Sequence, residues 1–586
     1  MYNEWSLDIF YKGIDDPALA NDMKELEDAV AKYKSAVSSL GLDDVSQTLH
    51  NVISLKETIS LKVRRLMGYF SLRRSTNSRD SEVSVPQTRI QTLMAGLAKE
   101  NTAFEAYVGK IEDIDAAIVG DEVLSEYKFY FYEVKKAVSH NMSSDAEDVF
   151  ARMNISGGSS WSNLVTYVTS TLEVEYNGEK TTLPAIRGLA EHDDQTVRRA
   201  AYESELASYA KVKDPIAFAL NSIKAQVNTE AELRGYENPL AITLDQSRMQ
   251  KATLDAMLEA MREYLPKFRE YLKHKAALLG HKNGLPWYDI FAPMGKADSH
   301  EFTVEEAHEY LVEHFESFAP DLAEMVDEAF KNDWIDFYSR PGKSGGAFCS
   351  NIPSLKQSRI LTNFSGSFGS VVTLAHELGH AYHGMMIQDH RPLNTGYTMP
   401  VAETASNFNE LIIVNDAIAK SSGEEKIQLI ESQLQDCTQI IVDIYSRFLF
   451  EHEVITRRKN TFMFSKDLEE IMINAQKEAF GDALDPEYLH PYMWCCKSHY
   501  YRAELSYYNF PYAFGGLFSR GLYAKYLEEG EAFLPKYRAL LKATTVDTVE
   551  NVASIAGIDL TEPEFWRKSL QIIADKIDEF IAETSK

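Results

Sequence analysis

The chain contains a short motif whose residue types and spacing are typical of metal chemistry, HELGH at residues 376–380. Residues four apart lie on one face of a helix, so His376 and His380 could bind one zinc ion together. Glu377 would then lie beside a metal-bound water and could act as its general base. The apolar run VVTLA directly before the motif favours a buried helix. The competing interpretation is a chance motif in an ordinary core helix.

A catalytic zinc usually has three protein ligands, so the sequence must supply one more. His383 is near in sequence, but the helical rise places it about 10 Å along the axis from His376, too far to share the ion. A second apolar helix is expected shortly after the motif, within VAETASNFNELIIVNDAIA. At helical spacing this segment carries Glu403, Asn407 and Glu410 along one face.

Glu403 is the predicted third zinc ligand, because a carboxylate on a buried face needs a partner. Glu410 or Asn409 could orient the ligating histidines through hydrogen bonds. The alternative for Glu403 is a carboxylate at the start of a helix, where it interacts with the helix dipole.

A glycine-rich segment, PGKSGGAFCS at 341–350, interrupts the helical pattern before the motif, and RILTNF at 359–364 predicts a short strand. Glycine lets a backbone approach another chain closely. An extended peptide could therefore pair with an edge strand here. The competing interpretation is an ordinary turn.

Three longer strings together resemble a known family: GKSGGAFCSNIPS, ILTNFSGSFGSVVTLAHELGHAYH and MPVAETASNFNE. They are similar to the M3 zinc metallopeptidases, specifically the oligoendopeptidase F branch. The resemblance implies a mainly α, two-part fold around a deep substrate cleft, with a small β element near the active site. It also implies one zinc ion per chain bound by His376, His380 and Glu403, with Glu377 as catalytic base. Its implied substrates are short peptides, and folded proteins are excluded.

The tetrahedral oxyanion of peptide hydrolysis needs a hydrogen-bond donor besides the metal. The resemblance implies a histidine and tyrosines from the segment that begins at His499, with Tyr508 and Tyr512 as candidates. Tyr512 follows a proline and precedes Gly515-Gly516, which predicts a loop that could adjust on closure. The competing interpretation is packing, because closely spaced tyrosines are usually part of a core.

Helical periodicity covers most of the chain, so we expect a mainly α protein in which strands are a minority. Asp16 followed by Pro17 is typical of a helix start. One β-hairpin is expected at 172–183, where alternating β-forming residues flank Asn177-Gly178, a dipeptide suited to a type I′ turn. Further helices are expected over 46–74, 86–138, 195–234 and 251–279.

A length of 586 residues exceeds what a single core usually supports, so more than one structural unit is expected. We place a boundary near residue 190. The predicted domains are an N-terminal helical domain with the β-hairpin, 1–190, and a zinc peptidase catalytic domain, 191–586.

The composition excludes several classes of partner. Asp and Glu number 88 against 60 Lys and Arg, and the formal net charge of −28 repels nucleic acids and anionic membranes. No run of about 18 uncharged apolar residues could cross a bilayer. The four cysteines form no spaced pair, and the first residues lack the basic and apolar segments of a secretory signal. A cytoplasmic localisation is therefore expected.

These observations favour a zinc-dependent endopeptidase that hydrolyses internal bonds of short oligopeptides. One alternative is a zinc carboxypeptidase on a similar helical scaffold, which would need a positive group for the terminal carboxylate of its substrate. Another is a non-catalytic peptide-binding module, which would require a catalytic residue to be missing. The oligomeric state is not predicted.

Overall fold

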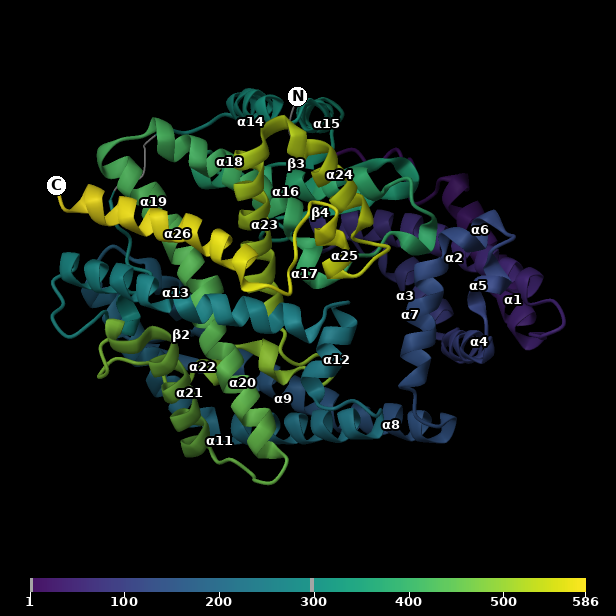
Figure 1. The fold of residues 1–586 in the computed structure, drawn as a ribbon, viewed down its shortest axis with the longest axis horizontal. Coiled ribbons are helices and arrows are strands. Elements are labelled where there is room, and N and C mark those ends of the chain that lie inside the picture. Colours follow the sequence, from purple (N-terminus) through teal and green to yellow (C-terminus); the bar gives the residue numbers. More distant parts are fainter. Residues whose placement is uncertain (1–3, 296–299) are drawn as a thin grey trace. The chain divides into compact units, whose positions relative to one another are not determined.

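The computed structural model describes residues 4–295 and 300–586, which form a mainly α protein (Figure 1). The chain divides into two compact units. Unit 1 comprises Met1–Asn141, Ser299–Val414 and Glu529–Ala556, and unit 2 comprises Met142–Asp298, Asn415–Glu528 and Gly557–Lys586. Each unit contains its own cluster of buried hydrophobic residues. The helical fold class predicted from periodicity is confirmed.

Each unit is built from three separate stretches of the chain. The boundary expected near residue 190 lies inside unit 2, so the segments 1–190 and 191–586 do not coincide with these units. Periodicity and composition report on neighbours in the sequence. A compact unit, in contrast, is defined by packing between distant stretches.

Unit 1 combines helices with a small sheet. Its helices are α1 (Pro17–Ser38), α2 (Val45–Thr76), α3 (Ser84–Ala95), α4 (Ala98–Lys110), α5 (Ile114–Ile118), α6 (Glu122–Glu126), α7 (Lys128–Ser139), α14 (Val304–Phe318), α15 (Pro320–Lys331), α16 (Phe368–Ile387), α17 (Met399–Ala402), most of α18 (Thr404–Lys420), α24 (Leu534–Ala543) and α25 (Val549–Ser554). In the sheet, β5 (Gln357–Leu361) lies between β3 (Ile335–Asp336), which is parallel to it, and β4 (Phe348–Ile352), which is antiparallel. Strand β4 is therefore an edge strand of this sheet.

The described part of unit 2 consists of helices together with a β-hairpin and an isolated β-bridge between Leu285 and Leu484. Its helices are α8 (Ser144–Ser156), α9 (Gly158–Ser170), α10 (Leu183–Gly188), α11 (Gln195–Leu233), α12 (Pro239–Gln246), α13 (Lys251–Leu278), α19 (Gly423–Thr438), α20 (Ile444–Arg458), α21 (Ser465–Phe480), α22 (Met493–Cys496), α23 (Phe510–Glu529) and α26 (Pro563–Thr584). A π-helical segment, Gln439–Asp443, joins α19 to α20. Such segments are rare and are often found at functional sites.

Two local predictions are confirmed in detail. Helix α1 begins at Pro17, and the Asp16 side chain accepts a hydrogen bond from the Ala18 N–H. The predicted hairpin consists of β1 (Glu173–Tyr176) and β2 (Glu179–Thr182), which pair antiparallel. At its turn, φ is 52° for Asn177 and 83° for Gly178, so both central residues have the positive φ of a type I′ turn.

The stretch 86–138, expected to be helical throughout, is divided into several helices, α3 to α7. The Asp113 side chain accepts a hydrogen bond from the Ala116 N–H and begins α5. Asp121 does the same for the Leu124 N–H and begins α6. Aspartate is a strong N-cap residue, so these side chains start new helices within a pattern that looks continuous.

Within residues 4–295 and 300–586, no helix combines the length and the apolar composition needed to cross a membrane. All four cysteines are free thiols.

Candidate functional site

The HELGH motif lies on α16, a helix that packs against β4 and β5 (Figure 1). Ser367 fixes the start of this helix, because its side chain accepts a hydrogen bond from the Ser370 N–H. Apolar residues bury much of the helix on both sides of the motif. His376 and His380 project from the same face, and the centroids of their rings are 4.9 Å apart.

Glu403 lies at a break between α17 and α18, where one continuous helix had been expected. Its Oε2 atom is 3.4 Å from His376 Nε2 and 3.3 Å from His380 Nε2. The Ser406 hydroxyl donates a hydrogen bond of 2.8 Å to the same oxygen. One ligand atom from each of His376, His380 and Glu403 lies within 4.8 Å of the others. The structure thus brings the three predicted metal ligands together.

Gly379, between the two histidines, allows α16 to approach α18 closely. A Cβ atom at this position would lie 2.5 Å from Ser406 Cα and 2.6 Å from the Ala405 carbonyl oxygen. Both distances are shorter than real Cβ contacts. A larger residue at position 379 would push the two helices apart and separate Glu403 from the histidines.

Glu410 holds His376 from the other side of the ring, because its Oε1 accepts a hydrogen bond from His376 Nδ1. The Nε2 atom, which faces Glu403, is then the one available to a metal. Burial alone would lower the pKa of His376, but the hydrogen bonds to Glu403 and Glu410 outweigh it and raise the pKa to about 10. Burial would raise the pKa of Glu403, yet its contacts with His376 and His380 lower it. Glu403 is therefore a charged carboxylate, the form that binds a cation.

These donors fit a zinc ion. Two imidazole nitrogens and one carboxylate oxygen are the ligand types of catalytic zinc sites. In such sites a second carboxylate commonly holds the other nitrogen of a ligating histidine, as Glu410 does for His376.

Glu377 is buried beside these ligands, with 6% of its surface exposed. Among the described residues, no hydrogen-bond partner reaches its buried Oε2 atom. Burial raises the pKa of this carboxyl, against the opposing effect of His376 and His380. A buried carboxylate whose pKa is raised is suited to accepting a proton near neutral pH.

Two further residues considered from the sequence lie outside the ligand set. His383 is fully buried, stacks on Tyr397 with ring centroids 4.3 Å apart, and is hydrogen-bonded to the Thr544 hydroxyl. It packs the far end of the helix, in agreement with its distance along the axis. Asn409 donates a hydrogen bond to the Ala375 carbonyl oxygen and so contacts the backbone of α16.

Some residues of the site had no clear signal in the sequence. Asn351 on β4 donates a hydrogen bond of 3.0 Å to the His380 carbonyl oxygen and so ties the sheet to the motif helix. Ser406 contacts Glu403, and its spacing of three residues after that glutamate is the signal that could have found it. Gly379 and Asn351 act through tertiary contacts that local patterns do not report.

The predicted oxyanion donors form an aromatic cluster within unit 2. His499 stacks on Tyr508, with ring centroids 5.0 Å apart and an angle of 15° between the rings, and Tyr512 contacts both edge-on. The guanidinium of Arg502 lies 4.7 Å from the centre of the Tyr508 ring. Burial lowers the pKa of His499 to about 4, and nearby basic side chains, Arg502 among them, add to this effect. His499 is therefore neutral at pH 7.

Tyr512 lies in the first turn of α23, and 36% of its surface is exposed. The prediction of a loop around Gly515 and Gly516 is wrong, because both glycines lie inside this helix. A Cβ atom on Gly516 would lie 2.4 Å from Ile440 Cδ1. The glycine therefore serves close packing. The catalytic roles of His499, Tyr508 and Tyr512 remain predictions.

Comparison with known proteins defines the class of this chain. Residues 188–572 match the model of peptidase family M3. This match covers more than half of the sequence. The chain belongs to peptidase family M3 and is a peptidase.

Its relatives place it within one branch of this family. Oligopeptidase PepF of Bacillus subtilis (strain 168) is 23% identical over 569 residues, which cover 95% of this chain and 83% of that protein. An oligoendopeptidase F homolog of Mycoplasma pneumoniae is 25% identical over 602 residues, covering 97% of this chain and 96% of the relative. The chain is a member of the oligoendopeptidase F branch.

Solved structures share the fold. A peptidase structure from Chlamydophila abortus superimposes with a TM-score of 0.84 at 18% identity and covers 99% of this chain and 98% of that one. Oligoendopeptidase-F from Enterococcus faecium gives a TM-score of 0.71 at 19% identity, covering 97% of this chain and 99% of its own.

Proposed function

We propose that this M3 peptidase is a zinc-dependent endopeptidase that hydrolyses internal bonds of short oligopeptides. The observation that carries the proposal is the convergence of His376, His380 and Glu403, with the buried Glu377 beside them. The names of its relatives, oligopeptidase and oligoendopeptidase F, support the substrate class. The localisation proposed from the cysteine content is the cytoplasm.

Zinc would be held by Nε2 of His376, Nε2 of His380 and the Glu403 carboxylate. When bound, the ion supplies Lewis-acid polarisation of the scissile carbonyl and acidifies a water molecule. Glu410 keeps the His376 ring in the orientation that leaves Nε2 for the metal. Gly379 and Ser406 keep Glu403 close to both histidines.

Glu377 is the proposed general base. Its carboxylate would accept the proton of the attacking water and then donate that proton to the leaving amine. Burial, which raises the pKa of this carboxyl, makes it a better proton acceptor than an exposed glutamate. The same group therefore serves both halves of the hydrolysis.

Strand β4 is the proposed contact for the peptide backbone. It is an edge strand and packs against the motif helix. An extended peptide could add to such an edge through main-chain hydrogen bonds, which explains how peptides of different sequence would be accepted. The phenol of Tyr512 is the proposed oxyanion donor, with Tyr508 and His499 as the other candidates.

The proposal is tested by metal analysis together with mapping of the products of a ten-residue peptide by mass spectrometry. The expected result is about one zinc per chain and cleavage at internal bonds. Glu377→Gln should retain the zinc and lose about 10²- to 10⁴-fold in turnover, because it removes a base and not a ligand. Glu309→Gln, at an exposed position on α14, is the matched control and should leave both quantities unchanged.

Full activity of Glu377→Gln would contradict the assignment of the base. Stepwise release of single carboxyl-terminal residues would indicate a carboxypeptidase instead of an endopeptidase.

A further inference from the structure

A cavity of about 300 Å³ lies within unit 2, remote in sequence from the HELGH motif. Its walls come from α10, α11, residues 287–291 and the π-helical segment Gln439–Asp443. This volume is at the lower end of the range of small-molecule sites. Arg187, whose side chain is 39% exposed, and the exposed Glu191 are among the lining residues and mark its opening.

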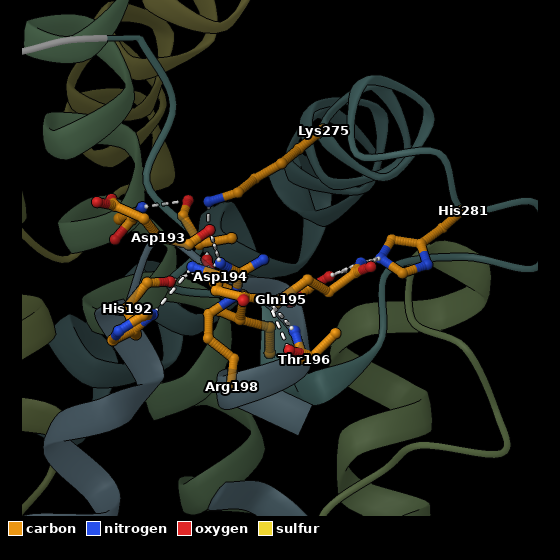
Figure 2. A network of polar contacts seen from close by, with 12 residues as sticks. His192, Asp193, Asp194, Gln195, Thr196, Arg198, Lys275 and His281 are labelled. Carbon is orange, nitrogen blue, oxygen red and sulfur yellow. Dashed lines mark hydrogen bonds and ion pairs between the residues drawn. The ribbon is translucent and has the colours of Figure 1, made fainter. Parts of the chain in front are cut away.

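One wall of the cavity is fixed by a buried polar network (Figure 2). Arg198 lines the cavity, donates a 2.8 Å hydrogen bond to Asp289 Oδ1 and also donates to the His192 carbonyl oxygen. The other carboxylate oxygen of Asp289 accepts a hydrogen bond from Gln195 and contacts the His281 ring. This wall is therefore rigid, and the charge of Arg198 is neutralised.

The segment 287–291, beside this wall, is held in place by a second buried cation. Lys275 donates a hydrogen bond of 2.9 Å to the Ile290 carbonyl oxygen and forms an ion pair with Glu431. This contact holds the segment that contributes Trp287, Tyr288 and Phe291 to the cavity. The aromatic wall is thus pre-formed and need not be ordered by a ligand.

The floor of the cavity contains a buried histidine, His490. His490 lines the cavity and is 1% exposed, and neither of its ring nitrogens has a hydrogen-bond partner among the described residues. Glu205 Oε1, in contrast, has charged partners, because it lies 3.5 Å from His490 Nε2 and forms an ion pair with Arg187 Nε at 3.3 Å. Buried polar groups are nearly always hydrogen-bonded, so a ligand with an acceptor atom would satisfy the ring N–H of His490 that the fold leaves without a partner.

Three cations, Arg187, Arg198 and Lys497, and three carboxylates, Glu191, Glu205 and Asp443, line the cavity, and Glu191 lies exposed at its opening. Arg198 is paired with Asp289, Asp443 with Arg447, and Glu205 lies close to Arg187. Lys497 also lines the cavity and forms no ion pair with a carboxylate of the described chain, although Asp443 and Glu205 lie close enough to interact with its charge. Burial lowers the pKa of Lys497, so an anion beside it would stabilise its charged form.

We propose that this cavity is a second binding site, which takes a small molecule with one carboxylate group and an apolar body. Lys497 and Arg187 would bind the carboxylate, His490 would donate a hydrogen bond to it, and the wall of Trp287 and Phe291 would contact the apolar body. The inference is separate from the peptidase proposal, because none of these residues is a proposed metal ligand, general base or oxyanion donor.

The probes are 3-phenylpropionate and its neutral isostere 3-phenylpropionamide, titrated into the full zinc-loaded chain by calorimetry. The expected result is saturable binding of the carboxylate at least about tenfold tighter than that of the amide, the difference that a charge-assisted hydrogen bond provides. Lys497→Gln should abolish this preference, while Lys459→Gln, at an exposed lysine of the same unit, should preserve it.

A carboxylate could also bind the metal of unit 1, and His376→Ala separates the two possibilities. Binding in the cavity predicts that His376→Ala keeps the full affinity for 3-phenylpropionate. Loss of binding in His376→Ala, equal affinity for the two probes, or unchanged preference in Lys497→Gln would each overturn the proposal. If circular dichroism shows that Lys497→Gln is unfolded, Arg187→Gln at the opening replaces it, with the same expected loss of preference.

Discussion

The two histidine-containing clusters place the same side chain in opposite electrostatic surroundings. In unit 1, His376 lies between the carboxylates of Glu403 and Glu410, which raise its pKa to about 10. In unit 2, His499 lies among aromatic rings and basic side chains, and its pKa falls to about 4. The first environment attracts a positive charge and the second excludes one.

This difference indicates different chemical tasks. A site that compensates positive charge with carboxylates is built for a cation. A neutral imidazole stacked on a phenol can instead donate or accept a hydrogen bond at pH 7 without bringing a charge. The comparison therefore associates the unit 1 cluster with a cation and the unit 2 cluster with uncharged hydrogen bonding, and four experiments examine it.

The largest effect is expected from loss of a ligand in the unit 1 cluster. His376→Ala should remove zinc and with it essentially all activity, because two remaining ligands hold the ion poorly. His383→Gln is the matched control, since His383 lies on the same helix but outside the ligand set. The zinc content per chain of both variants is measured after dialysis by inductively coupled plasma mass spectrometry. Zinc loss from His383→Gln with retention in His376→Ala would show that the ligands are misassigned.

The next effect concerns the unit 2 cluster. Tyr512→Phe removes one hydroxyl and should lower kcat by about 10²- to 10³-fold with little change in KM, as expected for one oxyanion donor. Zinc content and folding should be unchanged. Tyr508→Phe should be weaker, and His499→Ala should fall between the two. Steady-state kinetics on a quenched-fluorescence peptide measures this. A Tyr512→Phe enzyme within twofold of wild type would assign the phenol to packing.

A smaller effect distinguishes the ligand from the residue that orients a ligand. Glu410→Ala should weaken zinc binding by about 10- to 100-fold, because His376 loses the partner of its Nδ1 atom. Glu403→Ala should weaken it far more, since it removes a ligand. Competition with a zinc-binding dye measures both affinities. If Glu410→Ala weakened zinc binding more than Glu403→Ala does, Glu410 would be the ligand and Glu403 the orienting residue.

The smallest effect is expected from the protonation of His499, and it concerns the stability of the folded chain. Its pKa is about 4 in the folded chain against an ordinary value of 6.5, so between these pH values the unfolded chain binds the extra proton. His499 therefore costs stability as pH falls from 6.5 towards 4. His499→Gln should lose stability less steeply over this window, as measured by Tm against pH. A pKa above 6.5 for His499 by NMR would contradict its neutral environment.

Local features of this protein could be predicted from the sequence. The start of α1 and the hairpin turn depend on residues close together in the chain. Both were therefore predicted correctly, the first from Asp16 and the second from Asn177 and Gly178. The division of 86–138 into several helices was missed, because the caps Asp113 and Asp121 lie within a pattern that remains periodic.

The sequence by itself determined the chemistry that this chain can perform. The spacing of His376, Glu377 and His380 on one helix follows from helical geometry alone. Tertiary structure decided how that chemistry is assembled: the helix break at Glu403, the close approach of α16 to α18 at Gly379, and the hydrogen bond from Asn351 to the motif helix. The tertiary structure also forms the cavity around His490 and Lys497. These features depend on contacts between residues distant in the chain, which periodicity and local propensity do not encode.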